Sequence, residues 1–178
     1  ITRGDWDDEV ALAQGLAGCD CLFLNLLPSF TDAEAETRQG HRILRLARAA
    51  GVRHAIYSSL LLHPAALRPA PGTFTEPLQA RLDGLLGLMD GKAALDDAVR
   101  SNAFGFPHWT VLRPGFFMAN MLAPKCRFYG DFATTGTWTT ALRPVDELPL
   151  VDHADIARFA LAAARDPAVY HAREVQVA

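Results

Sequence analysis

The chain has 178 residues, of which 50% are hydrophobic and 21% are charged. This length and composition predict one domain with a sizeable core and exclude a disordered chain. The net charge of −3 comes without a run of Lys or Arg, so no nucleic-acid or membrane-surface partner is indicated. No apolar stretch is long enough to span a bilayer, and three cysteines make no disulfide framework. We therefore expect a cytoplasmic protein.

The first third of the chain alternates between predicted helix and predicted buried strand. Residues 5–18 predict a short helix that starts at acidic caps and carries its apolar residues on one face. The run 21–27 is apolar apart from one Asn, which is typical of a strand covered by helices on both faces. A helix over 33–50 and a second buried strand over 54–59 complete a strand–helix–strand unit. We expect its strands to be parallel and its crossover right-handed.

The rest of the chain continues the same alternation. The remaining predicted elements are, in chain order, an irregular loop over 62–77, one or two helices over 78–102, a strand over 109–115, a short helix or loop over 116–122, a surface segment over 129–148, a helix from Asp152 to about Pro167 and a closing strand over 175–178. Strands that alternate with helices and lack apolar–polar alternation favour an α/β fold. We predict a single domain over 1–178, with an open parallel sheet and helices on both faces.

Ligands of such sheets bind at the carboxyl ends of the strands, and the residues there are suited to a small molecule. The first strand ends at Asn25–Pro28, the second at Ser58 and Ser59, and the third at Arg113–Phe117. A few polar groups among apolar walls are usual for a ligand pocket, although such residues also cap loops and helices. Lys92 lies on the sheet-facing side of its predicted helix. Its ammonium either reaches out to solvent or approaches a polar group near the serines.

Five segments together resemble the NmrA-like branch of the atypical short-chain dehydrogenase/reductases. They are, in chain order, Gly4-Asp5-Trp6-Asp7-Asp8, Ala49–His54 leading to Tyr57-Ser58-Ser59, Lys92 at the start of a helix, Trp109–Asn120, and Leu148–Ile156. The resemblance covers nearly the whole chain in the right order. It implies a Rossmann-type NAD(P)-binding fold, and either a reductase of a small carbonyl or quinone-like substrate or a sensor of the NADP pool.

The resemblance also implies a set of cofactor contacts for NADP(H). The implied contacts are Asp5 and Trp6 beside the adenine, then Asn25, Leu26 and Pro28 along the pyrophosphate and ribose, then Ser58, Lys92, Pro114, Gly115 and Phe116 around the nicotinamide. Lys92, Ser58 and His153 are the candidate catalytic residues. The cofactor itself binds in the family to a glycine-rich turn between a first strand and a helix.

Two features of this chain depart from the family pattern. Nothing precedes Ile1, so we expect the first strand, the glycine-rich turn, the helix and the second strand to be missing from the chain. The strand over 21–27 would then form a bare apolar sheet edge, which predicts pairing with a second copy. In addition, the Tyr that donates a proton in classical members, four residues before the Lys, is Leu88 here.

The second departure leaves other functions open. A proton donor would have to be a histidine, with His63, His108 and His153 as candidates. A cofactor-free isomerase, cyclase or dehydratase that uses Lys92 and a histidine is one alternative. A binding module without catalysis, which holds a partner through the cleft or the sheet edge, is another. We expect no metal site, because Cys19, Cys21 and Cys126 lack a fourth ligand at useful spacing.

Overall fold

The computed structural model describes residues 2–63, 66, 73, 75–140, 142–143 and 145–178. Its elements, in chain order, are α1 (Glu9–Leu16), β1 (Cys21–Leu24), α2 (Ala35–Ala49), β2 (His54–Ser58), α3 (Glu76–Gly87), α4 (Asp90–Arg100), β3 (His108–Pro114), β4 (Phe116–Phe117), the 3-10 helices η2 (Met118–Met121) and η3 (Lys125–Phe128), α5 (Phe132–Thr135), β5 (Leu150–Val151), α6 (His153–Arg165), α7 (Pro167–Tyr170) and β6 (Arg173–Val177).

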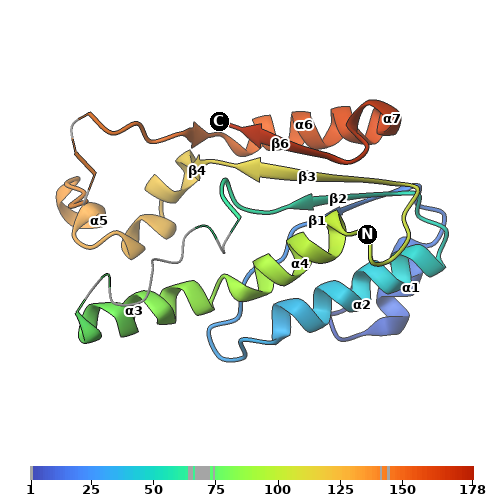
Figure 1. Ribbon diagram of the computed structural model, residues 1–178, viewed down its shortest axis with the longest axis horizontal. Coiled ribbons are helices and arrows are strands. Elements are labelled where there is room, and N and C mark those ends of the chain that lie inside the picture. The colour runs from blue at the N-terminus through green and yellow to red at the C-terminus, as the bar shows by residue number, and fades with distance from the viewer. Residues whose placement is uncertain (1, 64–65, 67–72, 74, 141, 144) are drawn as a thin grey trace.

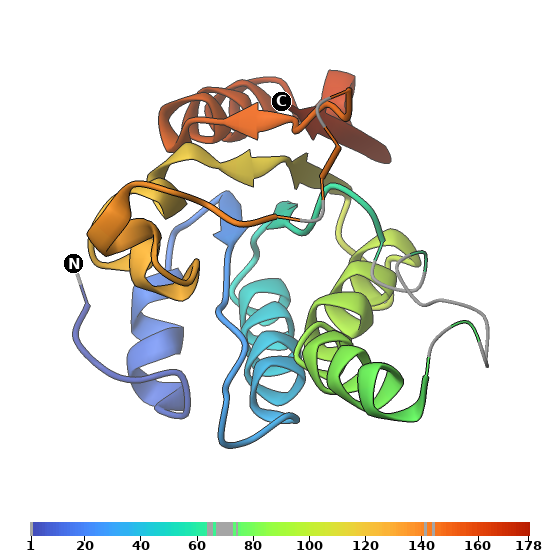
Figure 2. The ribbon, with the colours of Figure 1, turned by 90° about the vertical axis from the view of Figure 1, so that its left-hand side faces the viewer.

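Four strands form one parallel sheet in the order β1-β2-β3-β6. Helices α1, α2 and α4 cover one face of this sheet, and α6 and α7 cover the other (Figures 1 and 2). The predicted α/β fold with an open parallel sheet is thereby confirmed. No helix in the described part of the chain has the length and apolar character needed to cross a membrane.

The core consists of two layers because neighbouring side chains of β2 point to opposite faces of the sheet. Ala55 and Tyr57 pack with α2 and α4, while Ile56 packs with α6. All five residues of β2 are buried, as expected from a strand without alternation of apolar and polar residues. Acidic caps also act as predicted, since Asp8 accepts from the first turn of α1 and Asp152 from that of α6.

The strand predicted over 21–27 is shorter and less covered than expected. β1 ends at Leu24, and the side chain of Phe23 is 44% exposed. The reason is its position in the sheet: β1 lies at the edge and pairs with β2, whereas α6 packs on β2, β3 and β6. The prediction that helices cover both faces of the strand is therefore correct for β2 and wrong for β1. The strand predicted over 109–115 is confirmed with bounds one residue earlier, and the closing strand β6 already begins at Arg173.

Several short elements are not predicted from the sequence. Residues 116–122, predicted as a short helix or loop, contain the two-residue strand β4, which pairs with β5, followed by η2. The pairing depends on Gly115, because a Cβ there would lie 2.5 Å from the carbonyl oxygen of Pro149. Residues 78–102 form two helices, as one of the two predicted options, and 129–148 contain α5. Most of the loop predicted over 62–77 lies outside the described residues.

Candidate functional site

The carboxyl ends of β1, β2 and β3 lie side by side at one end of the sheet, which faces the viewer in Figure 2. We call this end of the sheet the carboxyl edge, to distinguish it from the edge strand β1. The register fixes this arrangement, since Leu24 is the partner of Tyr57, and Ser58 is the partner of Leu112. The segments that follow these strands therefore meet, as the sequence analysis expected for a ligand site.

Lys92 reaches this edge from the first turn of α4 and is buried there, with 7% of its surface exposed. Its Nζ donates a hydrogen bond of 2.6 Å to the carbonyl oxygen of Leu26 and lies 2.9 Å from Oε1 of Glu36. The ammonium also lies 5.7 Å from the centre of the Tyr57 ring. The sequence predicted that the Lys92 ammonium either reaches solvent or approaches a polar group, and the structure shows the second arrangement. The polar partners are Glu36 and the segment after β1, and not the serines.

Glu36 is a functional candidate that the sequence analysis missed. It belongs to the first turn of α2 and is only 1% exposed. Burial raises the pKa of its carboxyl group above the usual value, and the charge of Lys92 opposes that rise. Its Oε2 has no hydrogen-bond partner among the described residues and packs where a Cβ of Gly91 would otherwise lie. One signal could have found it: Glu36 lies seven residues before Ile43, on the buried stripe of the helix.

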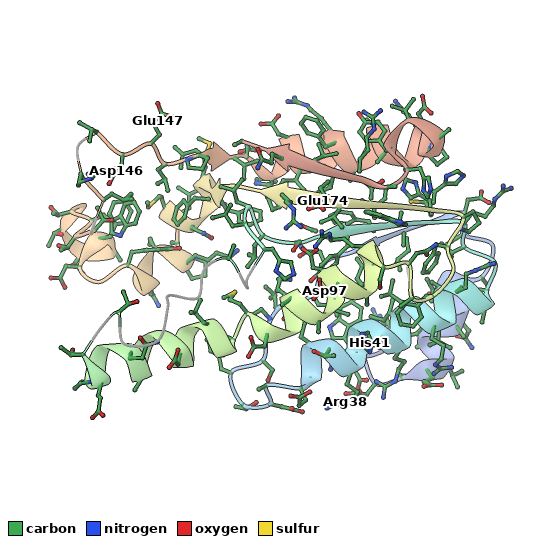
Figure 3. All side chains as sticks on the ribbon, in the orientation of Figure 1. Arg38, His41, Asp97, Asp146, Glu147 and Glu174 are labelled. Carbon is green, nitrogen blue, oxygen red and sulfur yellow. The ribbon has the colours of Figure 1, made fainter. Side chains whose placement is uncertain are left out.

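A second polar cluster, which we call the Arg113 network, has three buried members (Ser59, Asp96 and Arg113) and two exposed members (Arg100 and Glu174). Ser59 donates a hydrogen bond of 2.5 Å to Oδ2 of Asp96, which also pairs with Arg113 at 3.1 Å. On the other side, Nε of Arg113 donates to Glu174 of β6 at 2.6 Å, and Arg100 pairs with the same carboxylate. Glu174 is labelled in Figure 3. Both Asp96 and Arg113 are buried and paired, so this network ties β2, β3, β6 and α4 together.

Ser58 is not brought together with Lys92. The side chains of Ser58 and Tyr57 point to opposite faces of β2, and Lys92 lies against Tyr57. His153 is also apart from them, with a side chain that is 76% exposed and lies near Asp152 at 3.8 Å. Among the described residues, no hydrogen bond or ion pair joins these three candidate catalytic residues.

His63 and His108 are the other two candidate proton donors, and the position of His108 excludes it. His108 begins β3 at the amino end of the sheet, where its ring stacks edge-on with those of His54 and His171 at 6.0 and 5.3 Å between centres. The proposal of His108 as a donor at the carboxyl edge is therefore wrong. His63 follows β2 at the correct end and pairs with Asp97 at 3.2 Å.

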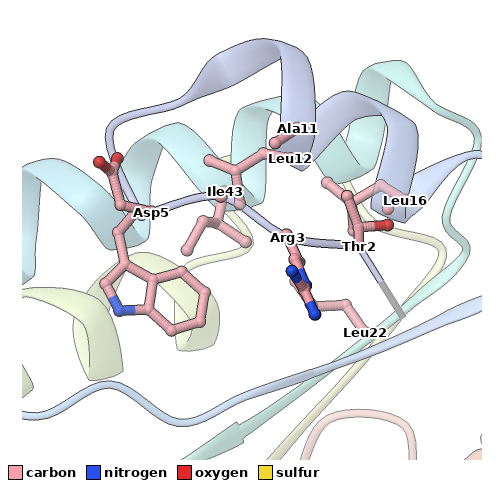
Figure 4. A pocket seen from close by; sticks show the side chains of 11 residues that line it. Thr2, Arg3, Asp5, Ala11, Leu12, Leu16, Leu22 and Ile43 are labelled. Atoms are coloured by element: carbon pink, nitrogen blue, oxygen red, sulfur yellow. The ribbon is translucent and has the colours of Figure 1, made fainter.

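The two predicted adenine contacts, Asp5 and Trp6, line a pocket of about 490 Å³ (Figure 4). The pocket lies between residues 2–6, α1, α2 and β1, and its walls are mainly apolar side chains, such as Leu22 and Ile43. Trp6 is 52% exposed, so its ring is free to stack on a flat ligand. Arg3 supplies a positive charge at the same pocket.

The remaining predicted contacts are distributed along the carboxyl edge. Asn25 is exposed, Leu26 is buried and Pro28 is half-buried, and the hydrogen bond from Lys92 to Leu26 holds this segment to α4. Pro114 is buried at the end of β3. Gly115 is the predicted glycine of close approach, but the group that approaches it is the backbone of Pro149. The ring of Phe116 stacks on Trp138 and meets Tyr129 edge-on, with centres 5.7 and 5.6 Å apart.

The whole sequence, residues 1–178, matches the profile of the NmrA-like family. The chain belongs to the NmrA-like family. Its fold is similar to that of an NADPH-dependent quinone oxidoreductase from Escherichia coli solved with NADPH, at 24% identity and a TM-score of 0.61. It is also similar to a double mutant of dTDP-glucose 4,6-dehydratase from Streptomyces venezuelae solved with NAD, at 20% identity and a TM-score of 0.65.

These alignments cover 100% and 98% of this NmrA-like chain, but 52% and 56% of the two solved chains. The chain therefore spans about half the length of the structures that it resembles. No match to a curated protein sequence was found. The likeness shows a Rossmann-like α/β fold, and the two solved proteins named above hold NADPH and NAD.

The residues of this NmrA-like chain fit the two ends of a dinucleotide. Trp6 and the apolar pocket beside it suit an adenine ring, and the buried Lys92 provides a fixed cation at the carboxyl edge. The middle of the dinucleotide needs backbone N–H donors from a glycine turn after a strand. Gly84, Gly87 and Gly91 lie within α3 and α4 and do not directly follow a strand, so these three glycines form no such turn. The described residues also contain no cluster of three or more potential metal ligands.

Proposed function

We propose that this protein binds NADP(H) across the carboxyl ends of β1, β2 and β3, and acts as a reductase of a small carbonyl or quinone-like compound or as a redox sensor. The observation that carries the proposal is the hydrogen bond from Lys92 to the Leu26 carbonyl. This hydrogen bond joins Lys92, an implied contact of the nicotinamide, to residues 25–28, which include the implied contacts of the ribose and pyrophosphate. Both lie at the carboxyl ends of the parallel strands, where ligands of such sheets bind.

NADPH, when bound, supplies a hydride, and the protein supplies orientation and a proton source. No tyrosine of the described residues occupies the usual donor position, because Leu88 lies between α3 and α4, four residues before Lys92. Tyr57 cannot replace it: the side chain is fully buried, burial raises the pKa of its hydroxyl group, and the hydroxyl donates to the Lys92 carbonyl at 3.4 Å. His153, exposed at the start of α6, is the histidine we assign to proton transfer in the reductase.

The same observations favour a second candidate function. A cofactor-free isomerase, cyclase or dehydratase, or a binding module without catalysis, needs neither a tyrosine beside Lys92 nor a grip on pyrophosphate. Leu88, which stands where the usual tyrosine would be, supports these alternatives. They differ from each other in one respect, since replacement of Lys92 would abolish turnover in an enzyme and would only weaken binding in a module.

Titration of NADPH into the folded protein by calorimetry, after a check of its intact mass, tests the proposal. We expect micromolar affinity, weakened about tenfold by Trp6→Ala through loss of stacking on the adenine. The matched control is Val169→Ala, a comparably exposed apolar residue on α7 at the opposite end of the sheet. Loss of NADPH absorbance in the presence of a small quinone then separates a reductase from a sensor. The absence of any heat from a folded sample would refute the proposal and favour the cofactor-free functions.

A further inference from the structure

The ion pair between Glu36 and Lys92 places two opposite charges in the protein interior, at the ends of two helices. Glu36 is in the first turn of α2, where the helix dipole favours a negative charge. Lys92 is in the first turn of α4, where the dipole disfavours its positive charge, and its side chain is 8% exposed. Glu36 therefore balances the positive charge of Lys92 in this position.

The ion pair also contacts the backbone of residues 25–28 at the carboxyl edge. The strand pairing of β1 with β2 ends at Leu24, so residues 25–28 continue without a strand partner. Leu26 is buried, whereas the next residue, Leu27, is 82% exposed. The Lys92 ammonium bonds the Leu26 carbonyl and Glu36 at the same time, and so joins this segment to both α2 and α4.

We propose that Glu36 is a positioning residue of the dinucleotide site. It holds the Lys92 ammonium against the Leu26 carbonyl, and thereby fixes residues 25–28 as one wall of the site. This role rests on the proposed function. Because the charged amine is neither a base nor a nucleophile, the arrangement assigns Lys92 to binding and orientation and not to covalent catalysis.

The first test measures the state of Lys92 directly, without any cofactor. The chain has two lysines, Lys92 and the exposed Lys125, so acetylation followed by mass spectrometry reports both in one sample. We expect Lys92 to react at least about tenfold more slowly than Lys125, and Glu36→Gln to remove most of that difference. Glu34→Gln, an exposed acid at the start of the same helix, is the matched control. Unchanged protection of Lys92 in Glu36→Gln would overturn the proposal.

The second test measures the effect on the dinucleotide. We expect Glu36→Gln to weaken NADPH binding about tenfold or more, because residues 25–28 lose their connection to α2 through Lys92. Glu36→Asp keeps the charge and should restore part of both the affinity and the protection of Lys92, even if Glu36→Gln fails to fold. Equal NADPH affinity of the wild type and Glu36→Gln would overturn the inference and leave the proposed function intact. Protection of Lys92 without any NADPH binding would instead refute the proposed function, and with it the dinucleotide role of Glu36.

Discussion

Replacement of Lys92 with Met shows how strongly the fold depends on its buried ion pair. The two side chains are 8% and 1% exposed, so Met leaves the carboxylate of Glu36 without a partner in the interior. Removal of one member of such a pair destabilises a protein by about 3–5 kcal/mol. The exposed pair of Arg38 and Asp32, each 48% exposed, has a comparable distance of 3.0 Å and should contribute only about 0–1 kcal/mol. The two ion pairs therefore differ in their expected contribution to the free energy of unfolding because one is buried and the other exposed, and not because of their distances.

The destabilisation should depend on pH because Glu36 can accept a proton instead of a counter-charge. Burial already raises the pKa of its carboxyl group, and Lys92→Met removes the charge that opposes this rise. The folded variant then holds a proton that the unfolded chain, with an ordinary carboxyl pKa near 4.5, has released. The stability of Lys92→Met relative to the wild type should therefore fall as pH rises from the carboxyl pKa of the unfolded chain to the raised pKa of the folded variant. The fall should be up to about 1.4 kcal/mol per pH unit.

Urea unfolding followed by circular dichroism, at several values from about pH 5 to pH 8, measures both effects. Lys125→Met, at the exposed lysine, is the matched control and should match the wild type throughout. If Lys92→Met is as stable as Lys125→Met near neutral pH, the reasoning from burial is refuted. A constant difference across the pH range would show that Glu36 does not take up the proton.

Three further predictions concern other parts of the molecule. Gly115→Ala places a Cβ 2.5 Å from the Pro149 oxygen and should lower the free energy of unfolding by about 1–3 kcal/mol. Gly84→Ala, which adds a Cβ in open space within α3, is the control and should raise that free energy by up to about 1 kcal/mol. Thermal unfolding measures both changes. Burial lowers the pKa of His54 to about 4 from 6.5, so stability should fall by about 3 kcal/mol as pH drops through this range, and His54→Gln should abolish that fall in urea titrations. At the sheet edge we propose a homodimer through β1, which Phe23→Lys should dissociate in sedimentation experiments; a well-folded wild-type monomer at micromolar concentration would contradict it.

Much of the site was accessible from the sequence because family motifs mark positions along the chain. The motifs identified Lys92, the segment 25–28 and Trp6, and the structure places Lys92 on that segment and Trp6 at a pocket. They did not identify Glu36 or the acidic members of the Arg113 network. Their partners belong to distant elements, so a local pattern can place Glu36 on the buried stripe of its helix but cannot show which residue it pairs with.

The sequence by itself determined the alternation of strands and helices, since apolar runs, acidic caps and glycines act over a few residues. It also determined the parallel α/β class, because strands without polar alternation, such as β2, are typical of a sheet that helices cover on both faces. The tertiary structure decided which strand lies at the edge, which partner Lys92 takes, and that β4 pairs with β5. Each of these depends on the relative position of elements remote in the chain. Whether a buried charge finds a partner is settled only when α2 and α4 pack together on the sheet.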